Sequence, residues 1–219
     1  MTTFWLSRSF QLAVIALVGA CQADEQPAPD APGSDSASAS AEAKPTAATE
    51  LTCTDPVRAS DTAATLQQRF GDQARVETLH GPEGIEFPGV VLWPDDPARR
   101  LEVVLAEEGQ RTVSSVGMSR TSAWRAAGLA LGDPLARANE ANGKPFKLWG
   151  FGWDYGGYAS DLADGKLAAL PGGCRVVMNL GPSEDAEVPD ALIGEVEISS
   201  DDPRLAAAGV TIYELSLAF

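Results

Sequence analysis

Hydrophobic positions at helical spacing are followed by an aromatic strand pattern between Leu131 and Tyr158. Three apolar or small side chains recur at every third position: Leu135, Ala138 and Ala141. This spacing predicts a helix with one apolar face. Asp133 is the expected N-cap, because its carboxylate can accept from the unpaired N–H groups of the first turn. Gly143 is the expected end, because glycine readily takes the left-handed conformation there.

The pattern beyond that helix changes to strict alternation. Phe151, Trp153 and Tyr155 alternate with other residues, which predicts a half-buried strand. Large aromatic side chains dominate core burial, so we predict that Trp149, Trp153 and Tyr155 belong to the core. The alternative is an exposed binding patch that these three rings form together with Asp154.

Similar patterns predict the other elements. A helix is expected at residues 61–70 with Asp61 as its N-cap, and one helical turn at residues 122–127. The expected strands cover residues 75–80, 85–93, 101–106, 111–118, 166–170, 174–180, 192–199 and 211–219. The predicted fold class is α+β, with an antiparallel sheet and few short helices packed on one face.

A weak internal repeat suggests two related halves, at residues 51–118 and 119–219. In each half a helix ends in a glycine and leads into antiparallel strands. An Asp-Asp-Pro turn precedes a later strand in both. The folded part is therefore expected to consist of two helix-plus-strands units.

The N-terminus reads as a targeting segment, residues 1–20, with Arg8 before an apolar run from Phe10 to Ala20. The stretch Val18-Gly19-Ala20-Cys21 resembles the lipobox of bacterial lipoproteins. That resemblance implies cleavage before Cys21 and acylation of this cysteine, palmitate included. Gln22 in the next position implies sorting to the outer membrane. The alternative is a soluble secreted or periplasmic protein that is cleaved after Ala23.

Residues 21–50 are rich in Ala, Ser, Pro and acidic residues, and residues 22–50 contain no aromatic side chain and no Val, Ile, Leu or Met. Such a composition cannot bury enough apolar surface to offset the entropy of ordering. We expect a disordered acidic tether here, followed by one folded domain at residues 51–219.

Net charge narrows the range of partners. The formal charge is −15, of which the tether accounts for −5 and the targeting segment for +1, which leaves −11 on residues 51–219. This charge argues against nucleic acid and against direct adsorption to anionic lipid, so a membrane would be reached through the lipid anchor only.

Cys53 and Cys174 are the cysteines that remain once Cys21 is assigned to the lipid. An even pair in an oxidising compartment predicts a disulfide, and two buried free thiols are the alternative. Neither cysteine belongs to a CxxC redox motif.

Two short stretches resemble known families. Gly132-Asp133-Pro134-Leu135 and Trp153-Asp154-Tyr155 are similar to the small outer-membrane lipoprotein of the barrel-assembly machinery, and the tandem layout is similar to the β-lactamase inhibitory protein. These families act by binding proteins. The NGKPF and GFGWDYGG runs also resemble uncharacterised exported bacterial proteins, which imply no activity.

No catalytic constellation stands out in the sequence. His80 is the one histidine, no GxSxG motif accompanies it, and a strand-end role is the favoured interpretation. The acidic pairs lack a DxDxDG loop, so neither a metal nor another cofactor is expected.

We therefore predict a non-enzymatic lipoprotein of the cell envelope that faces the periplasm and binds a periplasmic or envelope protein. The alternative is a binder of a small molecule or glycan, with aromatic rings around Trp149–Tyr155 as the platform. A hydrolase that depends on Asp154 is the least favoured class.

Overall fold

The computed structural model describes residues 49–81, 84–106 and 112–219. The expectations for the targeting segment, for Cys21 and for residues 21–48 of the tether concern residues outside these ranges. The described residues all belong to one compact unit, and the description below concerns this unit alone.

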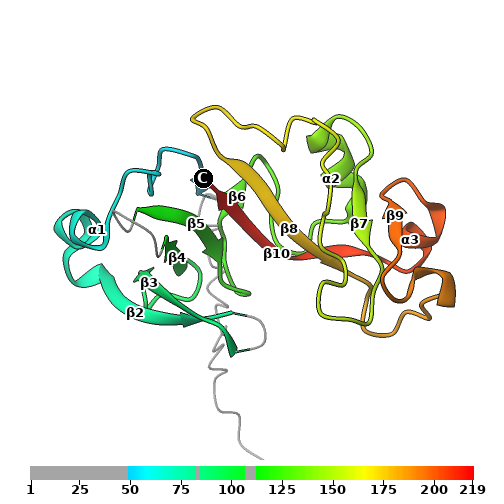
Figure 1. Ribbon diagram of the computed structural model, residues 1–219, viewed down its shortest axis with the longest axis horizontal. Helices are drawn as coiled ribbons and strands as arrows, with labels where there is room; N and C mark the ends of the chain where they lie inside the picture. Colours follow the sequence, from blue (N-terminus) through cyan, green and yellow to red (C-terminus); the bar gives the residue numbers. More distant parts are fainter. Residues whose placement is uncertain (1–48, 82–83, 107–111) are drawn as a thin grey trace, which may run out of the picture. The chain divides into compact units, whose positions relative to one another are not determined.

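The fold is α+β, as predicted, and is built on a six-stranded sheet with the strand order β2-β3-β4-β5-β10-β8 (Figure 1). Its strands are β2 (Ala74–His80), β3 (Glu86–Leu92), β4 (Leu101–Leu105), β5 (Val113–Met118), β8 (Arg175–Gly181) and β10 (Thr211–Ala218). All neighbouring strands in this sheet are antiparallel. All six strands were predicted, with small differences at their ends, because their apolar residues alternate or run continuously.

Short elements surround the sheet. The helices are α1 (Ala63–Phe70), α2 (Leu135–Asn142) and α3 (Pro203–Ala207), with 3-10 turns at Gly71–Gln73 and Asp190–Leu192. Two small sheets pair β1 (Glu50–Leu51) in parallel with β6 (Arg125–Ala126), and β7 (Lys147–Trp149) antiparallel to β9 (Glu197–Ser199).

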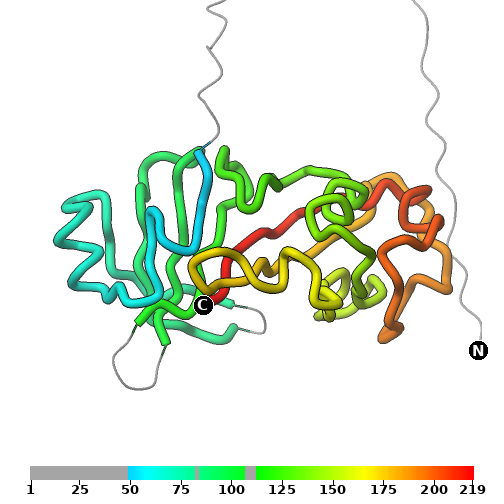
Figure 2. Tube along the Cα trace, turned by 90° about the horizontal axis from the view of Figure 1, so that it is seen from above, coloured from blue at the N-terminus to red at the C-terminus, as the bar shows by residue number. Residues whose placement is uncertain are grey.

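The structure does not confirm two separate related halves. The last strand, β10, lies between β5 of the first proposed half and β8 of the second, so one sheet contains strands from both (Figures 1 and 2). One hydrophobic cluster extends from Leu51 to Leu217 and includes residues of both segments. Residues 51–219 therefore share a single core.

Helix α2 ends at the expected residue but does not have the expected N-cap. Leu135 and Ala138 are buried, and the helix ends at Gly143, which has a left-handed φ of 80°, as predicted. Asp133 is not its N-cap, and Pro134 occupies that position without a side-chain cap. The Asp133 carboxylate instead accepts from the Ala130 N–H at 2.9 Å, which closes the preceding turn.

The expected cap of α1 was also one residue off. Thr62 caps the helix and forms a capping box with Thr65. Asp61 is buried, and its carboxylate accepts from Arg69 at 2.6 Å and from the Arg58 N–H at 2.9 Å. The carboxylate therefore ties the helix to the segment before it.

Three further predictions about elements were wrong. Residues 122–127 contain the short strand β6 in place of a helical turn, residues 166–170 form turns, and only residues 197–199 of the expected strand 192–199 are extended in a ladder. These segments have isolated apolar residues whose partners lie far away in the sequence, so local pattern does not determine their conformation.

Cys53 and Cys174 lie at disulfide distance, with the two sulfur atoms 1.98 Å apart and the Cα atoms 5.4 Å apart. Both residues are buried. The bond joins the start of the folded unit to the residue before β8, over a sequence separation of 121.

Candidate binding surface

Trp149, Trp153 and Tyr155 form a continuous group of rings, which we call the aromatic cluster. The ring centroids of Trp149 and Trp153 are 5.9 Å apart at an interplanar angle of 82°. Those of Trp153 and Tyr155 are 5.4 Å apart at 63°. Both contacts are edge-to-face, an arrangement that aromatic quadrupoles favour.

The aromatic cluster is not part of the core, so our core prediction for these three rings was wrong. The Tyr155 side chain is 59% exposed, and Trp149 and Trp153 are half-buried. By contrast Trp93 and Trp124 are only 7% and 4% exposed. The structure thus displays one group of aromatic residues and buries the other.

A break in the strand explains this outcome. Strand β7 ends at Trp149, and residues 150–157 form a loop. Leu148 of β7 and Phe151 of the loop are buried. The Gly157 N–H donates to the Trp149 carbonyl at 3.0 Å and closes the loop. Gly157 has a φ of 77°, and a Cβ atom there would lie 1.7 Å from the Leu180 carbonyl oxygen. The glycines therefore bend the chain. Beyond Trp149 the alternation of side chains no longer indicates an extended strand.

Internal hydrogen bonds hold the loop in place. The Trp153 indole N–H donates to the Gly150 carbonyl at 2.8 Å. The Tyr213 hydroxyl donates to the Gly156 carbonyl at 3.3 Å. Both bonds use the polar end of an aromatic residue and leave its ring available for contacts. Asp154 lies between the half-buried Trp153 and the exposed Tyr155 in sequence and is itself exposed.

Aliphatic residues from the segment before β9 extend this surface. Ile193 and Val196 are 42% and 39% exposed. The Gly150 N–H donates to the Val196 carbonyl at 2.7 Å, and the Phe151 N–H donates to the Leu192 carbonyl at 2.8 Å. These bonds hold the 192–196 segment against the aromatic loop. Neither aliphatic residue was predicted to belong to the surface, although Gly150 and Gly152 could have indicated a close approach of another segment.

Tyr213 of strand β10 also contributes to this surface. Leu215 and Leu217 of the same strand are buried, but a register shift between Ile212 and Glu214 turns Tyr213 outward, and it is 40% exposed. A hollow of about 520 Å³ lies between Trp153 and Tyr213, with Phe151, Leu180 and Pro182 in its wall. Burial and the neighbouring Glu214 carboxylate raise the pKa of the Tyr213 hydroxyl, which remains a donor at neutral pH.

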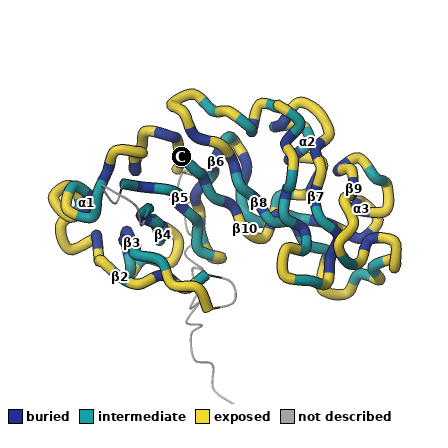
Figure 3. The backbone as a smooth tube through the Cα atoms, in the orientation of Figure 1, coloured by how far each residue is buried: buried dark blue, intermediate teal, exposed yellow. Residues whose placement is uncertain are grey.

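The surroundings of this surface are acidic. Residues 176–203 contain no Lys, Arg or His, and they include eight acidic residues: Glu184, Asp185, Glu187, Asp190, Glu195, Glu197, Asp201 and Asp202. Most of these side chains are exposed (Figure 3). Lys147 Nζ lies 2.6 Å from Glu197 Oε2, and the hydrogen bond to this carboxylate, followed by its charge, raises the lysine pKa. Two acids of the group are therefore paired with cations, Glu197 with Lys147 and Asp202 with Arg204.

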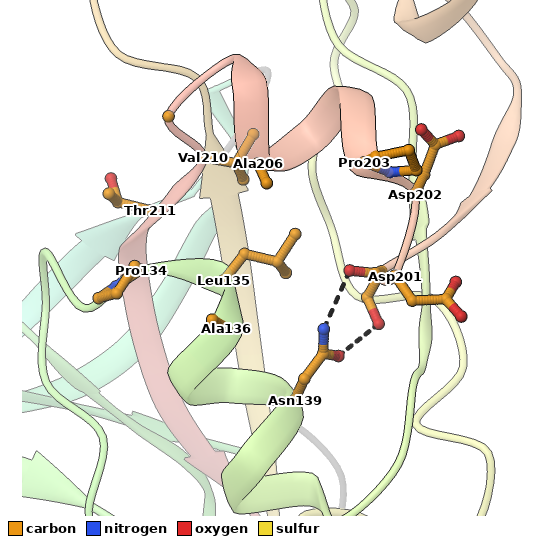
Figure 4. A pocket seen from close by; sticks show the side chains of 12 residues that line it. Pro134, Leu135, Ala136, Asn139, Asp201, Asp202, Pro203, Ala206, Val210 and Thr211 are labelled. Atoms are coloured by element: carbon orange, nitrogen blue, oxygen red, sulfur yellow. Dashed lines mark hydrogen bonds between the residues drawn. The ribbon is translucent and has the colours of Figure 1, made fainter.

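A second hollow, of about 380 Å³, lies between α2 and α3 (Figure 4). Its polar residues are bonded to each other: Asn139 Nδ2 donates to the Ser200 carbonyl at 3.0 Å, and Ser200 Oγ donates to Asn139 Oδ1. The carboxylates of Asp201 and Asp202 point away from Leu135 in Figure 4. This hollow has an apolar wall formed by Leu135, Ala206 and Val210, and its polar groups fasten α2 to the turn before α3.

The remaining predicted residues lie apart from both hollows. His80 is at the end of β2, exposed, with Nδ1 3.8 Å from Glu86 Oε1 across the β2–β3 ladder. Asp95 and Asp96 lie in the turn between β3 and β4. Across the ranges that the structure describes, no three His, Cys, Asp or Glu side chains are placed to hold a metal ion together.

Comparisons with known protein families, with curated proteins and with solved structures find nothing that matches this chain. In the described part of the chain, no helix has the length and apolar character needed to cross a bilayer.

Proposed function

We propose that this chain is an envelope lipoprotein, acylated at Cys21, whose folded domain acts as a non-catalytic protein-interaction module in the periplasm. The lipobox-like stretch before Cys21 and the acidic composition of the tether support the anchor. The membrane is reached through the lipid alone, since the domain carries a strong negative charge. The partner is a periplasmic or envelope protein.

One observation carries the binding part of the proposal: the aromatic cluster lies at the surface and is continuous with exposed aliphatic residues. Trp and Tyr are the residues most enriched at the energetic centres of protein interfaces. Tyr155, Ile193 and Val196 are all more than a third exposed and come from two segments held together by backbone hydrogen bonds. Contiguous exposed apolar side chains of this kind are typical of interaction sites on soluble proteins.

The acidic surroundings indicate the chemistry of the partner. An apolar centre with carboxylates around it favours a partner segment with apolar side chains flanked by Lys or Arg. An Arg or Lys side chain can also lie against the exposed Tyr155 ring as a cation–π contact. Binding should then weaken as salt concentration rises.

A glycan ligand is the second candidate, because the exposed Tyr155 ring next to Asp154 offers a stacking face with a polar neighbour. The ring planes are inclined at 82° and 63°, so the three rings do not form one flat platform. This geometry fits a protein side chain better than an extended sugar chain.

The test places a photoreactive phenylalanine analogue at position 155 in the full chain, in the cells that make it. Irradiation should yield a discrete protease-sensitive adduct, and adding Trp149→Ala should reduce it about tenfold or more, as expected for loss of an interface hot spot. The matched control carries the same analogue at Ile85, which is 50% exposed and lies outside the aromatic cluster. Equal adducts at positions 155 and 85 would contradict the proposal, and a protease-resistant, glycosidase-sensitive adduct would favour the glycan.

A further inference from the structure

We propose that two copies of this chain associate by antiparallel pairing of their β2 strands, so that two six-stranded sheets become one continuous sheet. β2 is the terminal strand of the sheet, and among the described residues only β3 pairs with it (Figure 1). β8 is at the other end of the strand order, and Leu180 of β8 lines the hollow beside the aromatic cluster. The β2 edge is thus a second surface, independent of the proposed function.

The hydrogen bonds to β3 show which backbone groups of β2 face outward. The Trp93 N–H donates to the Gln73 carbonyl at 2.8 Å, and the Gly81 N–H donates to the Ile85 carbonyl at 2.7 Å. In an antiparallel ladder, a residue directs its N–H and C=O to the same side, and the side alternates along the strand. Odd-numbered residues from 73 to 81 therefore face β3.

The even-numbered residues consequently present unpaired groups at the edge. Val76 and Thr78 direct both N–H and C=O outward. Ala74 also faces outward, but its N–H already donates to the Gly71 carbonyl, so only its own carbonyl is available. An extended strand is the partner that can satisfy such a row of donors and acceptors.

The positions of these groups select one register for a second copy. If the twofold axis passes beside Val76, the Val76 N–H of each copy donates to the Val76 carbonyl of the other. Each Thr78 N–H then donates to the Ala74 carbonyl of the other copy. The occupied Ala74 N–H has no role in this register, so the internal hydrogen bond to Gly71 is retained.

The charges of β2 match in the same register. Arg75 is then directly opposite Glu77 of the second copy, in the closely spaced type of cross-strand pair, where opposite charges stabilise. Arg75 Nη1 already lies 3.7 Å from Glu77 Oε1 within one chain, so the two side chains share a face. Across the twofold axis the four charges alternate in sign. A register centred on Glu77 would instead place like charges opposite each other and use backbone groups that face β3.

The other face of the strand supports the same pairing. Val76 is 52% exposed, although its neighbour Val90 on β3 is completely buried. In the proposed register, Val76 packs beside Val76 of the second copy. A β-branched residue that is exposed at the centre of an edge strand gains burial from this contact.

Disulfide trapping in the cells that make the full chain tests the register. Paired Val76 residues would have Cα atoms about 5.5 Å apart, within disulfide reach, whereas the two Thr78 residues would be about 14 Å apart. Val76→Cys should therefore give about tenfold more covalent homodimer on a non-reducing gel than the matched control Thr78→Cys. The unsubstituted chain supplies the background from its own cysteines. Equal trapping at positions 76 and 78, no trapping at 76, or an adduct with a different protein would overturn the proposal.

Reversal of the charges at positions 75 and 77 is a second test of the proposed pairing. In the Val76→Cys background, Arg75→Glu alone and Glu77→Arg alone should each reduce trapping to the background level, because each places like charges opposite one another. The combination of Arg75→Glu and Glu77→Arg should restore it, which also shows that both substitutions permit folding. Failure of the combination to restore trapping would overturn the pairing.

Discussion

Asn142 shows how one buried polar side chain fixes the turn after a helix. It is 1% exposed at the last position of α2. Its Nδ2 donates to the carbonyls of Lys144 and Leu162, both at 3.0 Å, and its Oδ1 accepts from the Leu167 N–H at 3.3 Å. The side chain thus replaces a strand ladder as the partner of three backbone groups, two of which lie far away in sequence.

Asn142→Ala should lower the free energy of unfolding by roughly 3 kcal/mol, because it leaves buried donors and acceptors without partners. The matched control on the same helix is Glu140→Ala, an exposed residue, with an expected change within about 0.5 kcal/mol. Urea denaturation of the three proteins measures both differences. A loss as small for Asn142 as for Glu140 would show that water replaces the side chain.

The helix end at Gly143 was predictable, since glycine at the C′ position has a local cause. The role of Asn142 as a buried anchor was not predictable, because its partners at Leu162 and Leu167 are defined only by the tertiary fold. The misassigned role of Asp133 has the same origin. A carboxylate near a helix start is a good local N-cap signal, but the turn at Ala130 uses it instead.

At the scale of elements, α3 is a capped helix that begins in a stretch with the sequence pattern of a turn. The Asp-Asp-Pro stretch was interpreted as a turn, but Asp202 caps α3 and Pro203 occupies its first position. The Asp202 carboxylate accepts from the Arg204 backbone N–H at 2.9 Å and from the guanidinium at 2.6 Å. The side-chain hydrogen bonds of Arg204, followed by the backbone bond, lower the Asp202 pKa to about 2.

This lowered pKa makes the cap sensitive to acid. Because the folded-state pKa is below the ordinary value of 3.8, the stabilisation is complete above that value and is lost as pH falls through about 2. Asp202→Asn keeps a good capping group without the charge. The stability difference between wild type and this variant should therefore be modest near neutral pH, since the pair is solvent-screened, and should vanish near about pH 2.

Unfolding monitored by circular dichroism at several pH values gives that difference directly. Other carboxylates titrate in both proteins and cancel in the comparison. A difference that stays constant between neutral pH and about pH 2 would mean that the Asp202 charge has no part in holding α3.

Residues 151–155 are the opposite case, a strand pattern in the sequence that does not form a strand. Alternation of Phe151, Trp153 and Tyr155 is a valid strand signal only where the backbone is extended. Here two glycines with positive φ, Gly152 and Gly157, interrupt the extension. The four glycines at positions 150, 152, 156 and 157 are a sequence pattern typical of a bulge and a turn. This pattern could not show that the aromatic loop would be fastened by residues 192–196.

At the scale of the whole molecule, fold class was predictable and topology was not. Alternating strands and few helices indicate an antiparallel α+β fold from local pattern alone. The position of β10 between β5 and β8 depends on the pairing of β10 with β5 across about a hundred residues, which leaves no local trace. For the same reason the apparent repeat misled: similar local motifs occur in both segments, yet their strands complete each other in one sheet.

Removal of the disulfide should have a large global effect. In the chain-entropy model, a loop closed over 121 residues contributes about 4 to 5 kcal/mol by restricting the unfolded chain. The double variant Cys53→Ala and Cys174→Ala should therefore unfold at a much lower urea concentration than the oxidised protein. Reductant should shift the wild-type protein to the same midpoint and leave the variant unchanged. An unaltered wild-type midpoint under full reduction would contradict this account.

The same bond determines how the folded unit would respond to a mechanical load. β1 lies beside β6 in parallel, and Cys53 follows β1 by two residues. Tension applied upstream of Glu50 would first shear this short contact and would then be transmitted through the sulfur atoms to Cys174 at the start of β8. The 120 residues between the two cysteines would bear none of this tension. A domain pulled at its N-terminal end would thus carry the load at Cys174, the residue before β8, and would keep its fold under the pull.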